Sequence, residues 1–232
     1  MKIKGIEKFT LIDYPEKIGC TIFLFGCNFR CGFCHNPELV LCEKRKDISK
    51  KEILEFLDKR KEKIEGVCIS GGEPMLSLDE EFLKEIKSRG YLIKIDTNGS
   101  FPEKLKNLIK KNLVDFVAID IKADKEKYEN LTGVKVNLEK IEESVKLASK
   151  IDYELRTTII ENIHNNDEII KMGKWVNELL GKKPKKFVLQ GFKSRGELIE
   201  KKFEDFKDTS EDFLKKLKKT AENYFEKVEV RV

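Results

Sequence analysis

The chain has 232 residues, a length that fits one large α/β domain. It carries 47 lysines and arginines against 42 aspartates and glutamates, a formal charge of +5 in a chain of which 38% is charged. This near balance indicates a solvated surface and argues against a nucleic-acid-binding groove. The sequence has no run of about 18 apolar residues, which argues against a membrane span.

The first 19 residues carry charges every few positions and lack the apolar segment of a signal peptide. We therefore expect a cytoplasmic protein, in which thiols stay reduced. The chain has six cysteines, three of them between residues 27 and 34. Clustered cysteines in a reducing compartment indicate metal or redox chemistry rather than a disulfide framework.

Predicted strands and helices alternate along the chain. Residues 1–19 predict a short β-hairpin, and the apolar run 20–25 predicts a buried strand. Further strands are expected at 66–70, 92–98, 114–121, 153–160, 185–192 and 227–232. Helices are expected at 49–64, from Ser77, after Pro102, and at 138–150, 166–180 and 210–223.

Six strand–helix units fall between residues 20 and 192, and a last helix and strand occupy 193–232. This alternation predicts a parallel sheet with helices outside it. Six units fall short of an eight-stranded barrel. We therefore expect a single α/β domain over 1–232, a partial (β/α)6 TIM-like barrel with the short N-terminal β-hairpin. An open doubly wound sheet is the alternative, which periodicity alone does not exclude.

Glycines and charged residues gather where these strands end. In parallel α/β folds the carboxyl ends of the strands meet at one rim, where active sites lie. Each motif alone fits a plain turn or a surface ion pair, but their common position predicts one site. The motifs in chain order are the cysteine loop 26–38, Gly71-Gly72-Glu73-Pro74, Asp96-Thr97-Asn98-Gly99, Asp120-Ile121-Lys122, Arg156 and Gln190-Gly191-Phe192.

The loop "GCNFRCGFCHNPE" contains Cys27, Cys31 and Cys34, followed by His35. "CGFCH" matches the pattern of covalent haem attachment, but a haem would leave Cys27 unexplained. Zinc would need the adjacent Cys34 and His35 to point at one tetrahedral ion. A redox dithiol would use only two of the three cysteines.

An iron–sulfur cluster takes cysteine thiolates as ligands. Three cysteines on a four-iron cluster would leave one iron open for a substrate or cofactor. Cys20 and Cys68 lie in apolar strands and are predicted core residues. Cys42, in a nearby loop, is the spare cysteine that could serve as a further ligand.

The spacing Cys27-x-x-x-Cys31-x-x-Cys34, with Phe33 just before the third cysteine, resembles the signature of the radical S-adenosylmethionine (SAM) enzymes. With the GGEP, DTNG and DIK motifs in that order, the chain resembles the glycyl-radical-enzyme activating enzymes. The resemblance is greatest to the activator of anaerobic ribonucleoside-triphosphate reductase, with pyruvate formate-lyase activating enzyme as a relative. It extends to about residue 192, and the chain has no cysteine-rich insert for extra clusters.

The resemblance implies that Cys27, Cys31 and Cys34 hold a [4Fe–4S] cluster whose open iron binds the amino and carboxylate groups of SAM. The residues it implies for SAM binding are Phe33, Gly71, Gly72, Glu73, Asn98, Asp120, Lys122 and Arg156. It also implies a monovalent cation beside SAM, for which oxygen ligands are suited. The cation ligands would be Asp96, Thr97, the Ala118 carbonyl and Asp120.

The implied activity is reductive cleavage of SAM, followed by removal of a hydrogen atom from a glycine of a partner enzyme, without a general base. The implied partners are a glycyl-radical enzyme and an electron donor of the flavodoxin or ferredoxin type, with no nucleic acid and no membrane. Two alternatives remain open. One is a radical SAM enzyme acting on a small molecule, such as 7-carboxy-7-deazaguanine synthase, and the other is a non-catalytic iron–sulfur or zinc-binding module.

Three residues near these motifs have no assigned role. His35 and His164 are the only histidines, and we expect both on the surface or in loops. Some relatives have a histidine after the sixth strand, where this chain has Gln190-Gly191-Phe192. We therefore assign no residue of this chain to the adenosine contact that the resemblance implies at this position.

Overall fold

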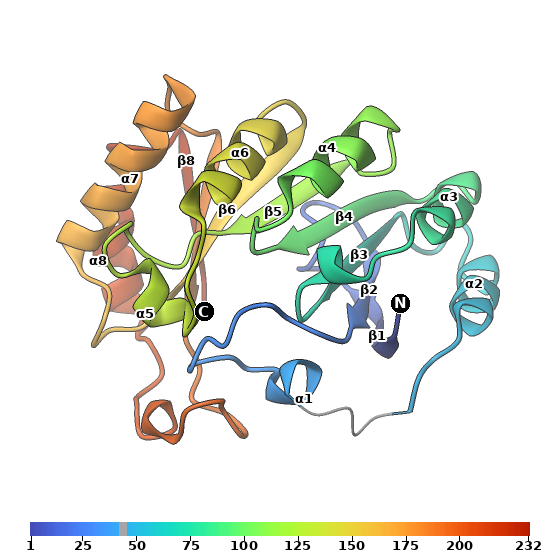
Figure 1. Ribbon diagram of the computed structural model, residues 1–232, viewed down its shortest axis with the longest axis horizontal. Helices are drawn as coiled ribbons and strands as arrows, with labels where there is room; N and C mark the ends of the chain where they lie inside the picture. Colours follow the sequence, from blue (N-terminus) through green and yellow to red (C-terminus); the bar gives the residue numbers. More distant parts are fainter. Residues whose placement is uncertain (42–45) are drawn as a thin grey trace. The chain divides into compact units, whose positions relative to one another are not determined.

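The structure is a computed structural model that describes residues 1–41 and 46–232 (Figure 1). Cys42, the spare cysteine of the sequence analysis, lies outside the described residues. The chain forms two compact units. Unit 1 comprises Met1–Asn28, Asn36–Thr97 and Phe101–Val117, and unit 2 comprises Phe29–His35, Asn98–Ser100 and Ala118–Val232.

Eight strands follow the sequence in their sheet order, from β1 to β8. All of the pairs within a unit are parallel except β1 with β2, so the predicted α/β class is confirmed. The strands are β1 (Ile3–Thr10), β2 (Gly19–Leu24), β3 (Gly66–Gly71), β4 (Leu92–Thr97), β5 (Phe116–Asp120), β6 (Asp152–Ile159), β7 (Lys186–Gly191) and β8 (Lys227–Arg231).

Unit 1 contains β1 to β4. The N-terminal hairpin consists of β1 and β2, so its second arm is also the first strand of the parallel series. The helices of this unit are α1 (Pro37–Val40), α2 (Lys50–Lys59), the 3₁₀ helix η1 (Pro74–Leu76), α3 (Glu80–Ser88) and α4 (Pro102–Lys110). Helices α2 and α3 lie side by side (Figure 1).

Two helices of unit 1 differ from their predicted bounds. Helix α2 begins at the predicted Ser49 capping box, but it ends at Lys59 because the chain turns through a positive φ of 67° at Glu62. Helix α3 begins after Asp79, whose side chain accepts from the Glu81 N–H, rather than at Ser77. The 3₁₀ helix η1 occupies the preceding residues.

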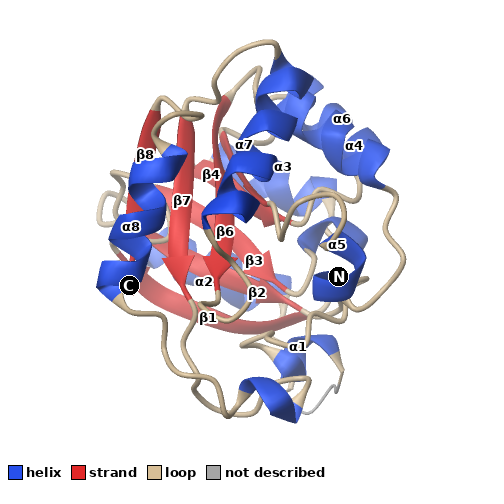
Figure 2. Ribbon diagram, turned by 90° about the vertical axis from the view of Figure 1, so that its left-hand side faces the viewer, coloured by secondary structure: helices blue, strands red, loops and turns tan. Residues whose placement is uncertain are grey.

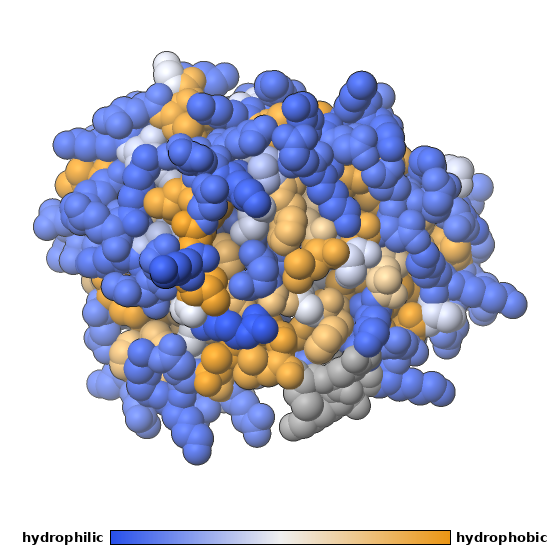
Figure 3. Space-filling view, viewed as in Figure 1, coloured by the Kyte–Doolittle hydropathy of each residue, from blue (hydrophilic) through white to orange (hydrophobic). Residues whose placement is uncertain are grey.

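Unit 2 contains β6 to β8, which lie side by side with α7 and α8 over one face (Figure 2). Helix α8 packs on β7 and β8. The helices of this unit are α5 (Tyr128–Thr132), α6 (Leu138–Ala148), α7 (Asn166–Leu180), the 3₁₀ helix η2 (Lys201–Phe203) and α8 (Glu211–Ala221). Hydrophilic residues cover most of the outward surface of α6 and α7 (Figure 3).

The two faces of β6 differ in chemistry. Tyr153, Leu155 and Ile159 are buried on one face, while the alternate positions Glu154 and Arg156 bring charges to the other face. Burial of the apolar face stabilises the unit, whereas the charged face requires partners. Among the described residues, no helix has the length and hydropathy needed to cross a membrane.

Candidate functional site

In unit 1, the turn after β3 packs against the start of the cysteine loop. The Glu73 N–H donates to the Gly26 carbonyl at 2.7 Å. A Cβ atom on Gly72 would lie 2.1 Å from the Gly26 oxygen and 3.3 Å from the Cys27 Cβ, which leaves no room for a side chain. Gly71 has a φ of +120°, a conformation that favours glycine. The glycine pair is therefore required for this close approach of two backbone segments.

The buried carboxylate of Glu73 joins two of the motifs. Its Oε1 accepts from the Met75 N–H at 3.0 Å and from the Thr97 hydroxyl at 2.8 Å. This second bond links the GGEP turn to the end of β4. Glu73 therefore braces the strand ends of unit 1, and its contact with SAM stays a prediction.

Asp96, near the end of β4, is paired within its own unit. The Ser70 hydroxyl donates to Oδ2 at 3.2 Å, and the Lys94 ammonium donates to Oδ1. Lys94 was not predicted as a site residue, although a lysine in the apolar run "LIKIDT" is a visible signal. A charged side chain inside an apolar strand needs a partner, and position i+2 lies on the same face.

In unit 2, the second half of the cysteine loop forms a tight turn. The Cys34 N–H donates to the Cys31 carbonyl at 3.0 Å. The Arg30 N–H donates to the Thr132 carbonyl at 2.8 Å, which fixes the loop to the end of α5. Burial raises the pKa of the Cys31 thiol to about 11, and the nearby Lys122 ammonium opposes that rise.

Phe33 lies in the interior of unit 2. Its ring makes an edge contact with Phe203 at a centroid distance of 5.9 Å. The Gly32 carbonyl accepts from the Glu200 N–H at 2.9 Å, and a Cβ on Gly32 would lie 2.5 Å from the Phe203 ring. The side chain of Phe33 thus anchors the loop, which leaves its backbone for the predicted contact with SAM.

Three charged residues meet where β5 ends. Asp120 accepts from Lys122 Nζ at 2.9 Å and from Arg156 Nε at 2.7 Å. Burial would raise the pKa of the Asp120 carboxyl, but the charges of Arg156 and Lys122 and their hydrogen bonds hold this pKa well below its usual range. Within this trio one carboxylate stands against two cations, and a group of this composition suits a carboxylate ligand.

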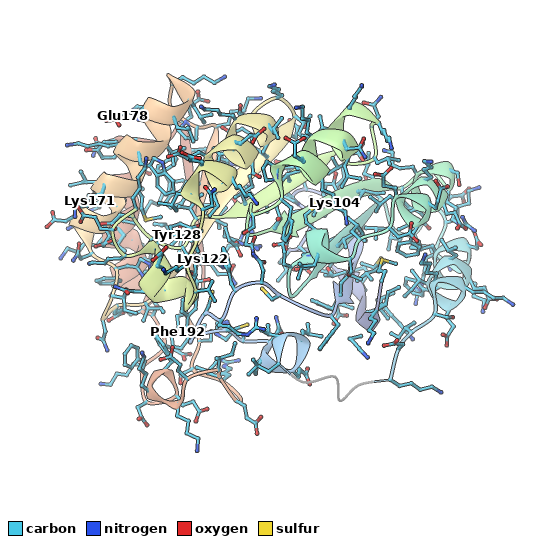
Figure 4. The ribbon with its side chains drawn as sticks, in the orientation of Figure 1. Lys104, Lys122, Tyr128, Lys171, Glu178 and Phe192 are labelled. Atoms are coloured by element: carbon cyan, nitrogen blue, oxygen red, sulfur yellow. The ribbon has the colours of Figure 1, made fainter. Side chains whose placement is uncertain are left out.

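Two buried side chains form hydrogen bonds to backbone carbonyls of this trio. The Tyr128 hydroxyl donates to the Asp120 carbonyl at 3.3 Å, and Lys122 and Tyr128 lie close together in Figure 4. His164 lies in a loop, as expected, between β6 and α7, but this loop residue is buried, with 1% of its surface exposed. Its Nδ1 accepts from the Ile160 N–H at 3.0 Å, so its Nε2–H donates to the Lys122 carbonyl at 3.1 Å.

The remaining predicted residues have structural contacts. The Asn98 side chain accepts from the Ser100 N–H at 3.0 Å, a local turn bond, and Ala118 is buried in β5. His35 is exposed, with Nε2 at 2.6 Å from the Lys193 carbonyl. Its ring centroid lies 5.4 Å from that of Phe192, so the histidine links the cysteine loop to the segment after β7.

The donor chemistry fits the predicted cofactors. A cysteine turn supplies thiolate ligands for an iron–sulfur cluster, and the two cations of the Asp120 trio suit the carboxylate of SAM. In the described part of the chain, no three His, Cys, Asp or Glu side chains are grouped as a ready metal site. The assignment of Cys27, Cys31 and Cys34 as ligands therefore stays a prediction.

Comparisons with known proteins match the chain to one superfamily. The model of the Radical SAM superfamily matches residues 21–176. A protein of Methanocaldococcus jannaschii, provisionally named a glycyl-radical enzyme activating enzyme, is 32% identical over 99% of this chain and 95% of its own length. The pyruvate formate-lyase-activating enzyme of Staphylococcus epidermidis is 29% identical over 76% of each chain.

The crystal structure of Streptococcus suis SuiB bound to S-adenosylmethionine superposes with a TM-score of 0.68. At 17% identity, covering 89% of this chain and 48% of SuiB, this likeness concerns the fold alone. It confirms the predicted fold class. Radical SAM enzymes use a [4Fe–4S] cluster and SAM, in agreement with the predicted cofactors. The chain belongs to the radical SAM superfamily and, within it, to the glycyl-radical enzyme activating enzymes.

Proposed function

We propose that this chain generates a glycyl radical on an anaerobic ribonucleotide reductase. The similarity along 99% of the chain to an activating enzyme is the observation that supports the reaction. The choice of the reductase rests on the motif resemblance to its activator, and the lack of a cysteine-rich insert favours a minimal activating enzyme. A flavodoxin- or ferredoxin-type protein in the cytoplasm would supply the electron.

When bound, the cluster supplies one electron, and SAM supplies the 5′-deoxyadenosyl radical that removes a hydrogen atom from the partner's glycine. The residues of the chain bind and orient these groups. Cys27, Cys31 and Cys34 would hold the cluster as thiolates. Lys122 and Arg156 would bind the SAM carboxylate as cationic hydrogen-bond donors beside Asp120.

The glycine turn of unit 1 has a separate role. Gly71 and Gly72 let this turn pack directly on the chain at Gly26, and the turn held in this way would meet the SAM amino group. Glu73 and Thr97 hold this turn through their hydrogen bond. The proposal assigns no general base, since removal of a hydrogen atom from a glycine requires none.

The experiment starts with the chain reconstituted anaerobically with iron and sulfide and then reduced. Addition of SAM should yield 5′-deoxyadenosine, and its complete absence would contradict SAM cleavage. The reduced enzyme is next incubated with SAM and an anaerobic ribonucleotide reductase, and a glycyl radical is sought by electron paramagnetic resonance. A radical on pyruvate formate-lyase alone would reassign the partner, and turnover that requires a small molecule would favour the alternative enzyme class.

A matched pair of cysteine variants tests the ligand assignment. Cys31→Ala should lose the cluster, measured as iron and sulfide content and visible absorbance. Cys20→Ala should retain it, because Cys20 is buried within β2, outside the cysteine loop. A full cluster in Cys31→Ala would show that the ligands are wrongly assigned.

A further inference from the structure

Lys94 is a buried lysine on a strand of the candidate site. Its side chain is 0% exposed, and its ammonium donates to Asp96 Oδ1. The Cys68 sulfur lies 3.9 Å from Nζ, and the Phe116 ring centroid lies 6.0 Å away. Removing an ammonium from water is unfavourable by several kcal/mol, so such a residue requires the carboxylate that it contacts.

The partner of Lys94 is one of the residues implied to bind a monovalent cation. Both oxygens of Asp96 already accept hydrogen bonds, one from Lys94 and one from Ser70. The hydroxyl of Thr97, a second implied ligand, donates to Glu73 at 2.8 Å. In unit 1, the side-chain oxygens expected to face a metal cation therefore have partners within the protein.

The same is true of Asp120, the implied side-chain ligand in unit 2. Asp120 accepts from Lys122 on Oδ2 and from Arg156 on Oδ1. The charges add to zero for Asp96 with Lys94, and to +1 for Asp120 with its two partners. Hard cations are retained by negatively charged oxygen ligands, and neither of these two groups offers a net negative charge. The neighbouring Glu73 carboxylate already accepts from the Met75 N–H and the Thr97 hydroxyl. The implied cation site does not fit the residues of this chain.

We infer that Lys94 is a tethered cation: a positioning residue whose ammonium holds Asp96 at the end of β4, so that this chain needs no bound monovalent metal ion. Lys94 and Asp96 are two residues apart on β4 and face the same side, which fixes the ammonium beside the carboxylate. The inference rests on the proposed function only in placing Asp96 beside SAM. The charge pairing itself stands on the contacts of unit 1.

The unmodified chain gives the first test. The protein reconstituted with its cluster is melted in potassium, sodium and choline chloride at one ionic strength, and the three melting midpoints should coincide. SAM cleavage under the same salts should proceed at equal rates. A saturable rise of the midpoint with potassium or sodium, absent with choline, would overturn the inference. This measurement needs no turnover, so it is independent of the glycyl-radical reaction.

The variant Lys94→Met gives the second test, because it removes the ammonium and leaves the Asp96 carboxylate without its cation. We expect a lower melting midpoint that potassium or sodium partly restores and choline does not. SAM affinity should fall about tenfold without those ions, the effect expected for a weakened charge-assisted contact, and recover when they are added. Lys94→Arg should keep the insensitivity of the unmodified chain to the choice of salt.

Lys4 provides a matched control in unit 1. It is a buried lysine on β1, paired with Asp47, whose side chain is 50% exposed. Lys4→Met should lose stability without rescue by potassium or sodium, because water solvates the remaining carboxylate. If Lys94→Met responds to the ions no more than Lys4→Met, Lys94 is an ordinary buried ion-pair partner and the inference is wrong. If Lys94→Met does not fold, the salt dependence of the unmodified chain decides.

Discussion

Unit 2 contains two charged clusters on the same face of β6, and they differ in net charge. The Asp120 cluster consists of Asp120, Lys122 and Arg156. The Glu154 cluster consists of Glu154, Glu229, Lys186 and Arg231. The second cluster has two acids and two bases and is balanced, whereas the first has one acid and two bases.

The Glu154 cluster joins three strands. Glu154 on β6 is 0% exposed and accepts from both Nη atoms of Arg231 on β8, at 3.1 and 2.9 Å. Lys186 on β7 lies 3.3 Å from Glu154 and 2.9 Å from Glu229. Because its internal charges cancel and its acid Glu154 is fully buried, this cluster needs no ligand and serves to hold the strands together.

The Asp120 cluster lies closer to the strand ends. Arg156 is two residues nearer than Glu154 to the carboxyl end of β6, and Asp120 is the last residue of β5. A purely structural ion cluster would gain nothing from a surplus positive charge, which is unfavourable to bury. Net charge and position along the strand, rather than the number of ion pairs, therefore distinguish the candidate ligand site from the structural cluster.

The largest loss of stability is expected from a substitution that breaks the Glu154 cluster. Glu154→Gln leaves Arg231 and Lys186 without their buried carboxylate, so the free energy of unfolding should fall by about 3 kcal/mol. Urea denaturation measures this loss. SAM affinity of the folded protein should not change. Glu229→Gln, at an acid that is 32% exposed, is the control and should lose at most about 1 kcal/mol.

A second pair of variants compares the two lysines. Lys122 and Lys186 have similar side-chain exposures, 13% and 16%, and each contacts the acid of its cluster. Lys122→Met should weaken SAM binding about 30-fold, through the lost contact with the SAM carboxylate. Lys186→Met should lower stability and leave SAM affinity unchanged. Calorimetric titration of the reconstituted, oxidised enzyme with SAM measures both affinities.

Equal losses of SAM affinity in the two lysine variants would contradict the distinction between the clusters. Lys122→Arg adds a further control, since it keeps the charge but changes the geometry. It should bind SAM more tightly than Lys122→Met. If it does not, the role of Lys122 is one of packing rather than of charge.

Most of the fold could be predicted because its signals are local. Helix α7 has the predicted bounds: Asn165 caps its first turn, and Gly181 ends it with a positive φ of 66°. Helices α1 and α5 were not predicted, because segments of 4 and 5 residues are too short to show a helical period. The end of α2 was missed for lack of a glycine or proline at the turn.

Part of the candidate site could also be predicted from local signals, and part could not. The strand-end motifs were found because parallel strands direct their carboxyl ends to one rim. Other contacts depend on how distant segments pack. Asp96 accepts from both Lys94 and Ser70, and His164 donates to the Lys122 carbonyl. Sequence spacing indicates that a buried charge needs a partner, but it does not identify the contacts that tertiary packing supplies.

The smallest expected effect concerns the support of the Asp120 cluster. Burial holds the pKa of His164 below its ordinary value of 6.5; the Lys127 charge also lowers it, while the bonds to Lys122 and Ile160 oppose the shift. The unfolded chain then binds a proton at a higher pH than the folded one. The stability associated with neutral His164 is present above pH 6.5 and is lost as the pH falls below it, by at most about 1.4 kcal/mol per pH unit.

His164→Gln should remove that part of the pH dependence, because glutamine does not titrate. Urea unfolding at several pH values on both sides of 6.5 compares the slopes of the variant and the unmodified chain. His35→Gln, at the exposed histidine, is the control and should keep the original slope. SAM affinity in His164→Gln should fall only a few-fold, since the Lys122 ammonium keeps its bond to Asp120. A loss as large as that of Lys122→Met would mean that the backbone position set by His164, rather than the surplus charge, governs SAM binding.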